Sequence, residues 1–260
     1  MERFVSVHDG KFKAKLMEKG QGEPLLFLHG AGGSRDWPPF LELLSQEFHV
    51  YAPWHPGYDE SEGIDYIDDM LDIVLYYYDF LDAIGVESTN VLGHSMGGMI
   101  AAEMAAICPH RVSRLVLASA AGLWLDEEPM PDLFAMMPNE LMPAIWHDPT
   151  CEAAQQMIPP MDDPEAMALA FISRAQSLAV AGKFLWPLPD RGLSKRLDRI
   201  RAPTLILWGE SDGLIPLAYG KALQRGIKNS RLDVMRECSH MLMAEKPEEF
   251  AEKVSAFLKG

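Results

Sequence analysis

Short apolar runs alternate with amphipathic stretches along most of the chain. Runs that are apolar throughout indicate strands buried on both faces of a sheet, at residues 25–28, 115–118 and 204–208. Three further strands are predicted, at residues 49–53, 88–92 and 232–235. Helical spacing of apolar positions follows most of these strands, at residues 40–48, 98–108, 217–225 and 247–258. This alternation predicts an α/β fold with a mostly parallel sheet, covered by helices on both faces.

Two segments in the first third of the chain have patterns of their own. Residues 4–7 and 12–17 alternate between apolar and polar, which predicts an antiparallel hairpin that turns at Asp9 and Gly10. A later segment carries apolar residues at helical spacing, namely Ile64, Ile67, Leu71, Val74, Leu75, Tyr78 and Leu81. Its acidic residues are Asp65, Asp68, Asp69, Asp72, Asp79 and Asp82. We interpret them as the solvated face of one helix rather than as a metal or partner site.

Residues 122–193 interrupt the alternation because no buried strand is predicted there. Roughly seventy residues are too many for a plain loop, so the segment is interpreted as a helical cap inserted into a core of residues 1–121 and 194–260. Its large side chains are Trp124, Met130, Met136, Met137, Met142, Trp146, Met157, Met161, Met167 and Trp186. Most of these are expected in the core of the cap. Trp124, Met137 and Trp186 are the candidates for contact with a substrate, together with Met241 in the core.

Composition limits the classes of function. The formal net charge of -15 argues against binding to nucleic acid or to anionic membranes. No apolar run approaches the ~18 residues that a membrane span needs, and we recognise no signal peptide at the start. Three widely spaced cysteines form neither a disulfide framework nor a zinc pattern. A cytoplasmic location is expected. The oligomeric state stays open, with a homodimer as one option.

The most informative motif is Gly-His-Ser-Met-Gly at residues 93–97, between a predicted strand and a predicted helix. This arrangement is a nucleophile elbow, in which the serine stands on a tight turn with the start of a helix beneath it. The flanking glycines are needed because side chains there would collide with the adjacent strand and helix. The motif predicts that Ser95 is a nucleophile.

Two further residues complete a catalytic triad. A serine needs a base, and histidine suits that role because its pKa lies near neutrality. His240 follows the last predicted strand, and Asp212 follows the strand before it, so both lie where the carboxyl ends of parallel strands meet. The order Ser, Asp, His is the one that accompanies this elbow. Glu210 is the nearest competitor for the acid.

The negative charge that develops on a substrate oxygen needs donors already in place. The backbone N–H of Met96, directly after the serine, is one predicted donor. The N–H of Ala31, in the glycine-rich loop after residues 25–28, is the other. This loop lacks the lysine and the glycine spacing of nucleotide-binding loops, so no nucleotide is expected.

At this point the chain resembles the α/β-hydrolase superfamily over essentially its whole length. The matching pieces are HGAGG at residues 29–33, PGYDES at 56–61, GHSMGG at 93–98, WGESD at 208–212 and Ser239-His240. The resemblance implies an eight-stranded sheet with a cap, no cofactor, and transfer of an acyl group to Ser95 followed by hydrolysis. Ser95 departs from the epoxide-hydrolase and haloalkane-dehalogenase branches, which use aspartate there.

The elbow and the cap also resemble the carbon–carbon bond hydrolases of aromatic degradation. Those enzymes carry tryptophan after the catalytic histidine, where this chain has Met241, and use a cap arginine for a carboxylate. Arg174 is a candidate for that arginine, although we interpret it first as a surface helix residue. Enol-lactonases and cofactor-free perhydrolases are further relatives.

We therefore expect a serine hydrolase that cleaves a small or medium carboxylic ester, thioester or lactone with an apolar part. In this interpretation Ser95 attacks the carbonyl, His240 moves the proton and Asp212 orients His240. Carbon–carbon hydrolysis of a vinylogous diketone with the same triad is the alternative. A third hypothesis is a ligand receptor that keeps the fold and a slow hydrolase activity.

Overall fold

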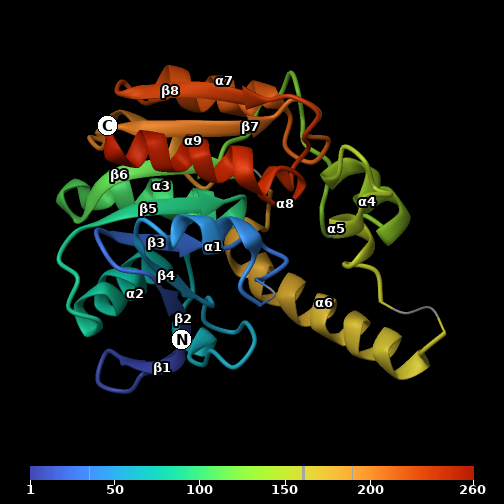
Figure 1. Cartoon of the computed structure of the whole chain (residues 1–260), viewed down its shortest axis with the longest axis horizontal. Helices are drawn as coiled ribbons and strands as arrows, with labels where there is room; N and C mark the ends of the chain where they lie inside the picture. The colour runs from blue at the N-terminus through green and yellow to red at the C-terminus, as the bar shows by residue number, and fades with distance from the viewer. Residues whose placement is uncertain (35, 160–161, 189) are drawn as a thin grey trace.

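Eight strands form one sheet in the order β1-β2-β4-β3-β5-β6-β7-β8, seen in Figure 1. This computed structural model describes residues 1–34, 36–159, 162–188 and 190–260. The strands are β1 (Glu2–Val7), β2 (Phe12–Lys19), β3 (Pro24–Leu28), β4 (His49–Pro53), β5 (Thr89–His94), β6 (Val112–Ala118), β7 (Thr204–Gly209) and β8 (Ser230–Met235). The predicted hairpin is confirmed, because β1 and β2 pair in antiparallel register.

The six strands from β4 to β8 in this order run parallel to one another. Only β2 runs in the opposite direction, since it pairs antiparallel with both β1 and β4. The carboxyl ends of β3, β5, β7 and β8 consequently meet at one edge, where open α/β sheets bind their ligands. Strands β5 and β7 are buried along their whole length.

Helices cover both faces of the sheet, as the alternating pattern predicted. They include α1 (Pro39–Leu44), α2 (Met70–Ala83), α3 (Met96–Ile107), α7 (Leu217–Gly226), α8 (Leu242–Glu245) and α9 (Pro247–Lys259). Helices α1 and α9 pack together in front of the sheet in Figure 1, and α2, α3 and α7 lie behind it. The predicted helix over residues 40–48 is shorter than expected, because α1 ends at Leu44.

The predicted helix over residues 64–82 is wrong in its start and in part of its face. Its first turn is a separate 3-10 segment, η1 (Ile64–Tyr66), and α2 begins only after Asp69, whose carboxylate accepts the N–H groups of Leu71 and Asp72. Asp69 is therefore the N-cap residue that sets where α2 begins. Leu71 and Leu75 therefore face outward, with exposed fractions of 49% and 47%. The buried face is instead made by Met70, Ile73, Val74, Tyr76, Tyr77, Tyr78, Phe80 and Leu81.

The segment of residues 122–193 contains α4 (Pro138–Ile145), α5 (Glu152–Gln155) and α6 (Pro164–Leu185) and, in its described part, no strand. Figure 1 shows α4 and α5 beside the carboxyl edge of the sheet and α6 extending away from it. Met161 lies outside the described residues. None of the described helices combines the length and the apolar character that a bilayer crossing requires. The division into core and cap stays a prediction.

Candidate active site

Ser95 stands at the junction of β5 and α3 in a backbone conformation that residues with side chains rarely adopt. Its φ and ψ angles are 54° and -118°, so the turn carries strain of the kind found at functional sites. Gly97 explains how the turn fits. A Cβ atom on Gly97 would lie closer than 3.0 Å to the carbonyl oxygens of Leu28 and His29 on the neighbouring strand end. Only a glycine lets α3 start this close to β3.

Asp212 and His240 form a buried hydrogen-bonded pair. The distance from His240 Nδ1 to Asp212 Oδ2 is 3.0 Å, and the two side chains are 4% and 0% exposed. The other carboxylate oxygen, Oδ1, accepts the backbone N–H groups of Leu214 and Ile215 at 3.0 and 2.8 Å. Because carboxylate oxygens accept hydrogen bonds, Nδ1 of His240 is the donor in this pair. The other ring nitrogen, Nε2, is the one that a general base would use.

His94 fixes the backbone of His240 from the elbow. Its Nε2 donates to the carbonyl oxygen of His240 at 3.0 Å, and the two ring centroids are 4.9 Å apart. Burial, with a smaller contribution from His240, lowers the pKa of His94 to about 3. His94 therefore stays neutral near pH 7. Its ring links the backbone of His240 to the serine turn.

Ser95 is 7% exposed, and its side chain borders the glycine-rich loop after β3. A Cβ atom on Gly30 would lie 3.2 Å from Ser95 Cβ and 3.0 Å from His94 Nδ1. Within the described ranges, neither Ser95 Oγ nor His240 Nε2 forms a hydrogen bond. The Asp212–His240 pair is thus held next to the serine turn through His94, whose ring bonds to the His240 carbonyl oxygen.

The two predicted oxyanion donors are the backbone N–H groups of Ala31, in the loop after β3, and of Met96, at the start of α3. No acceptor among the described residues is recorded for the backbone N–H of Ala31 or of Met96. The carbonyl oxygen of Gly30, which shares a peptide plane with the Ala31 N–H, accepts from His29 Nδ1 at 2.8 Å and from Gly33 N at 3.1 Å. Because a trans peptide is planar, fixing that carbonyl also fixes the direction of the Ala31 N–H.

A buried chain of hydrogen bonds supports this loop from below. The Tyr77 hydroxyl bonds to His55 Nδ1, and His55 Nε2 donates to the carbonyl oxygen of His29 at 2.9 Å. The backbone N–H of His55 donates to His29 Nε2 at 3.1 Å. Burial lowers the pKa of His55 to about 4 and the pKa of His29 well below its ordinary value. Both rings are therefore neutral, and each nitrogen has one role in the chain.

The end of α4 is bonded to the loops that carry Asp212 and His240. The carbonyl oxygen of Ala144 accepts from Gly213 N and from Ser239 Oγ, each at 3.0 Å. Glu245 accepts the backbone N–H of His147 at 2.6 Å and that of Ser239 at 2.7 Å. These bonds tie the inserted segment to the acid and to the base.

Comparison with known proteins places this geometry in a family. A family model described as the alpha/beta hydrolase family matches residues 25–253. The chain belongs to the alpha/beta hydrolase family. Its eight-stranded sheet with helices on both faces is the alpha/beta hydrolase fold.

Two curated relatives and one solved structure cover nearly all of the chain. A 2-hydroxy-6-oxo-6-phenylhexa-2,4-dienoate hydrolase of Comamonas testosteroni is 28% identical, over 93% of this chain and 90% of the relative. A 2-hydroxy-6-oxononadienedioate/2-hydroxy-6-oxononatrienedioate hydrolase of Pseudomonas putida is 30% identical, over 99% and 96%. The structure of a membrane phospholipase A, described as a bacterial virulence factor, is 28% identical with a TM-score of 0.83, over 100% of this chain and 86% of that one. These relatives support a hydrolase as the enzyme class.

The four residues predicted to contact substrate differ in exposure and in hydrogen bonding in this alpha/beta hydrolase. Met137 and Trp186 are 61% and 54% exposed. Trp124 Nε1 donates to Asp126 at 3.0 Å, and the Met241 N–H donates to Ile145 at 3.1 Å. The four assignments stay predictions, as do the roles of Ser95, Asp212, His240, Ala31 and Met96. In the described part of the chain, no group of three or more acidic, histidine or cysteine side chains is arranged to hold a metal.

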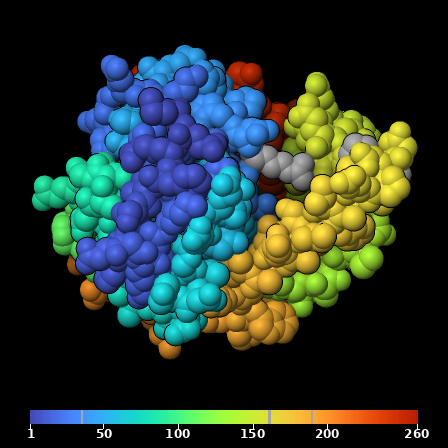
Figure 2. Space-filling view, turned by 90° about the horizontal axis from the view of Figure 1, so that it is seen from below, coloured from blue at the N-terminus to red at the C-terminus, as the bar shows by residue number. Residues whose placement is uncertain are grey.

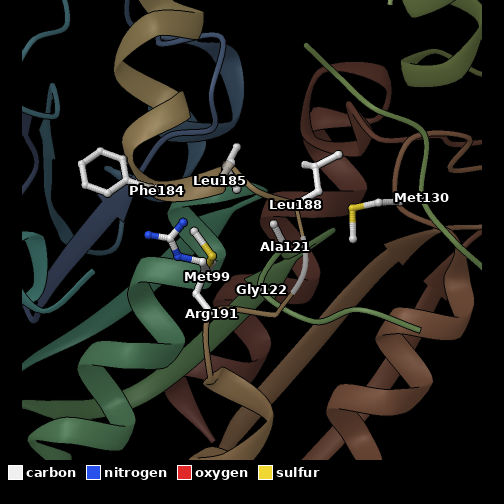
Figure 3. A pocket seen from close by; sticks show the side chains of 8 residues that line it. All are labelled: Met99, Ala121, Gly122, Met130, Phe184, Leu185, Leu188 and Arg191. Carbon is white, nitrogen blue, oxygen red and sulfur yellow. The ribbon is translucent and has the colours of Figure 1, made fainter. Parts of the chain in front are cut away.

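A small apolar cavity lies between the core and the inserted segment (Figure 3). Its lining residues are Met99, Ala121, Gly122, Met130, Phe184, Leu185, Leu188 and Arg191. Met99 lies one turn beyond Ser95 on α3, and the Ala121 N–H donates to the carbonyl oxygen of Ser95 at 3.0 Å. The cavity therefore adjoins the serine turn. Of the residues that line it, the sequence analysis had named only Met130.

Tyr58, His55 and His94 make contacts here that the sequence pattern does not indicate. Tyr58 lies in the PGYDES piece, which carried the family resemblance without a role for the tyrosine. The available signal was that His55 and Tyr58 follow β4, and that His29 follows β3, its neighbour in the sheet. Nothing in their spacing indicated that they contact one another.

Proposed function

We propose that this alpha/beta hydrolase cleaves a carbon–carbon bond in a 2-hydroxy-6-oxo-dienoate, with Ser95 as the nucleophile. The observation that carries the proposal is similarity over nearly the whole chain to hydrolases named for such substrates, at 28% and 30% identity. The positions of Ser95, Asp212 and His240 support it. The proposal replaces ester cleavage, the first interpretation of the sequence, with the alternative stated beside it.

The chemistry asks for a proton shuttle and an oxyanion site, which these residues can supply. In the 2-keto tautomer of the substrate, C5 carries the proton that left the 2-hydroxyl. Ser95 Oγ adds to the C6 carbonyl carbon, His240 takes the serine proton, and the N–H groups of Ala31 and Met96 stabilise the oxyanion. The C5–C6 bond then breaks, and its electron pair moves through the conjugated chain to the C2 oxygen, which takes the proton from His240. Water activated by His240 hydrolyses the acyl-serine.

Arg174 is the proposed partner of the substrate carboxylate. It lies on α6, is partly buried, and donates from Nη2 to the carbonyl oxygen of Met136 at 3.2 Å. It precedes Ser177 by three positions, which is about one helical turn, and the Ser177 carbonyl is in contact with Tyr58 beside the oxyanion loop. A carboxylate would offer Arg174 a bidentate, charge-assisted bond in place of the single bond to a neutral carbonyl.

Ester hydrolysis is the second candidate, and a specific observation favours it. The solved phospholipase A is as similar in sequence as the first relative, at 28% identity, and shares the fold with a TM-score of 0.83. Met241 also departs from the tryptophan that carbon–carbon hydrolases carry after the histidine. The same triad and oxyanion donors serve an ester, whose alkoxide leaves with the proton from His240.

A direct substrate comparison tests the proposal. The purified protein is assayed with 2-hydroxy-6-oxo-6-phenylhexa-2,4-dienoate, followed by the loss of its dienolate absorbance, and with nitrophenyl esters of C2 to C12 acids. We expect kcat/KM for the dienoate to exceed that for the best ester. A higher kcat/KM for an ester would favour the second candidate, and no turnover of either would contradict both.

Replacing Arg174 separates the two candidates further. For Arg174→Gln we expect KM for the dienoate to rise about tenfold or more, because a charge-assisted hydrogen bond contributes about 1.5–3 kcal/mol. Activity on an uncharged ester should change little. Arg225→Gln, an exposed arginine on α7, is the matched control. An unchanged KM for the dienoate in Arg174→Gln would show that Arg174 does not bind the substrate carboxylate.

A further inference from the structure

Tyr58 lies between the oxyanion loop and the helix α6. It is 3% exposed, and its hydroxyl is 3.0 Å from the carbonyl oxygen of Ala31 and 3.1 Å from the carbonyl oxygen of Ser177. A hydroxyl has one hydrogen, so the two carbonyls share a single donor. Burial raises the pKa of Tyr58 well above its ordinary value, which keeps that hydrogen in place at assay pH.

In the oxyanion loop, the hydrogen bond from the Tyr58 hydroxyl fixes the carbonyl group of Ala31. The peptide before Ala31 is already fixed through Gly30, which bonds to His29 and to Gly33. Among the residues that the structure describes, Tyr58 is the recorded partner of the Ala31 carbonyl. The next residue, Gly32, has no neighbour within 4 Å of where a Cβ atom would stand. Without Tyr58 the loop is therefore held on one side of Ala31 only.

On the other side, the same segment of chain holds the C-terminal part of α6. Lys183 Nζ donates to the carbonyl oxygens of Ile64 and Ile67 at 3.1 and 2.8 Å. A Cβ atom on Gly57 would meet Val180 Cγ2 at 2.9 Å, which shows how closely the Val180 side chain packs on the backbone of Gly57. Figure 2 shows the gold end of α6 against the cyan segment that contains η1. Tyr58 thus bridges the oxyanion loop and α6.

We propose that Tyr58 is a positioning residue that ties the Ala31 oxyanion donor to α6, so that the seating of the cap helix and the geometry of the oxyanion site are coupled. The proposal rests on the proposed hydrolase function, in which the Ala31 N–H stabilises the oxyanion. When α6 is seated, the Tyr58 hydroxyl bridges both carbonyls. When α6 moves away, the loop loses its link to the cap but keeps its support from His29 and Gly33.

This coupling predicts an effect on the transition state rather than on substrate binding. A displaced Ala31 N–H weakens the bond to the tetrahedral oxyanion more than any bond to the ground-state carbonyl. Loss of a whole oxyanion donor costs about 10²–10³ in kcat. Because Tyr58→Phe leaves the donor in place and only loosens it, we expect a smaller fall in kcat, of about tenfold, with KM nearly unchanged.

Tyr78→Phe is the matched control for Tyr58→Phe. The Tyr78 hydroxyl also donates to a buried backbone carbonyl, that of Met104 at 2.7 Å, and Tyr78 is 8% exposed. It lies on α2, and among the described residues its hydrogen bonds and ring contact outside that helix are with Met104 and Arg111 rather than with the oxyanion loop. Both variants remove one tyrosine–carbonyl hydrogen bond, so both should lower the melting temperature by similar amounts. Only Tyr58→Phe should lower kcat.

Binding of phenylboronic acid supplies the readout that a structural role would not change. Boron forms a tetrahedral adduct on an activated serine, and one of its oxygens occupies the oxyanion position. We expect Tyr58→Phe to weaken this binding by about the same factor as kcat, and Tyr78→Phe to leave it unchanged. If Tyr58→Phe keeps the wild-type kcat and boronate affinity, the proposal is overturned. If the wild-type protein turns over neither substrate class, the proposed function fails instead.

Lys183→Met tests the cap side of the coupling with Tyr58 intact. Loosening α6 should lower kcat and boronate affinity in the wild-type background. In the Tyr58→Phe background the same change should have little further effect, because the link that transmits it is already missing. Fully multiplicative effects of the two substitutions would contradict the coupling. If Tyr58→Phe does not fold, Lys183→Met alone decides, and an unchanged boronate affinity in it overturns the proposal.

Discussion

The two helices α3 and α6 differ sharply in how firmly the rest of the molecule holds them. Of the 12 residues of α3, 11 are buried, whereas α6 buries only Ala181 and Phe184 of its 22 residues. Helix α3 begins at the serine turn and packs on β5 and β6 along its length. Helix α6 is fixed near its C-terminal end and exposes Leu169, Phe171 and Ile172 nearer its N-terminal end. Helix α3 is therefore held along its length, whereas α6 is held near one end.

This contrast separates two tasks of the site. In the proposed function Ser95 is the nucleophile, which must stand within a fraction of an ångström of its productive position and therefore benefits from a firmly packed helix. Substrates of different shape require a surface that can adjust, and a helix anchored at one end provides it. Tyr58 joins the two regions, because its hydroxyl contacts the oxyanion loop of the core and the backbone of α6.

The largest expected difference in stability between the two helices comes from replacing one glycine of each by alanine. In Gly97→Ala on α3 the new Cβ would lie under 3.0 Å from two backbone carbonyl oxygens, which cannot move without shifting β3. We expect a loss of about 3 kcal/mol or more in the free energy of unfolding. In Gly182→Ala on α6 the nearest atom is Phe134 Cε1 at 3.8 Å, so better helix propensity should stabilise the protein by about 0.5–1 kcal/mol. Urea unfolding measures both.

Equal effects of these two substitutions would contradict the comparison. A tolerated Gly97→Ala would mean that the start of α3 can move away from β3. A strongly destabilising Gly182→Ala would mean that α6 is packed more tightly than its exposed surface indicates.

Acid should weaken the core through the histidines below the oxyanion loop. His55 has a pKa of about 4 in the folded protein against 6.5 when unfolded, so the unfolded state binds the proton first as pH falls. Its contribution to stability is complete above pH 6.5 and falls progressively toward pH 4, where the loss is about 3 kcal/mol. In His55→Gln the free energy of unfolding should fall less steeply between pH 6.5 and 5. Parallel pH profiles of the two proteins would show that His55 takes up its proton in the folded state as readily as in the unfolded state.

The contact between α4 and the histidine loop should have an intermediate effect. Glu245 accepts backbone N–H groups from His147 and Ser239, next to His240. Hydrogen bonds to a charged group contribute about 1.5–3 kcal/mol, so Glu245→Ala should destabilise by about 2 kcal/mol. It should also lower kcat, because the loop before the base loses a bond. Thermal unfolding and steady-state kinetics measure the two effects, and an unchanged kcat would show that this bond does not position His240.

The smallest effect is expected at the free end of α6. Phe171 is 60% exposed, so Phe171→Ser removes little buried surface and should change the free energy of unfolding by no more than about 0.5 kcal/mol. A melting curve is sufficient for this comparison. A large loss of stability would show that Phe171 is covered in solution, and that α6 packs along more of its length than the structure shows.

The core was predictable because its pattern is local. Continuous apolar runs identified β3, β6 and β7, and the glycines around Ser95 identified the elbow between β5 and α3. The positions of Asp212 and His240 followed from strand ends alone, since parallel strands deliver their following loops to one edge. Helix α2 was misplaced because the capping by Asp69 depends on its side chain, which the apolar spacing does not reveal.

The surroundings of the site were not predictable in the same way. Tyr58 bonds to residues 27 and 119 positions away in sequence, and such contacts exist only once the cap is packed on the core. The same holds for the cavity, which is lined from α3, from the loop after β6 and from α6 with the loop that follows it. Exposure of Met137 and Trp186 likewise depends on how the cap helices are placed.

Comparing wild type with Ser95→Ala on 2-hydroxy-6-oxo-6-phenylhexa-2,4-dienoate tests the central claim most directly. Ser95 has little exposed surface, and its side chain forms no hydrogen bond with the residues that the structure describes, so the substitution should leave stability nearly unchanged. We expect kcat/KM to fall about a thousandfold or more. A Ser95→Ala variant that turns the dienoate over at a rate close to that of the wild type would show that Ser95 is not the nucleophile.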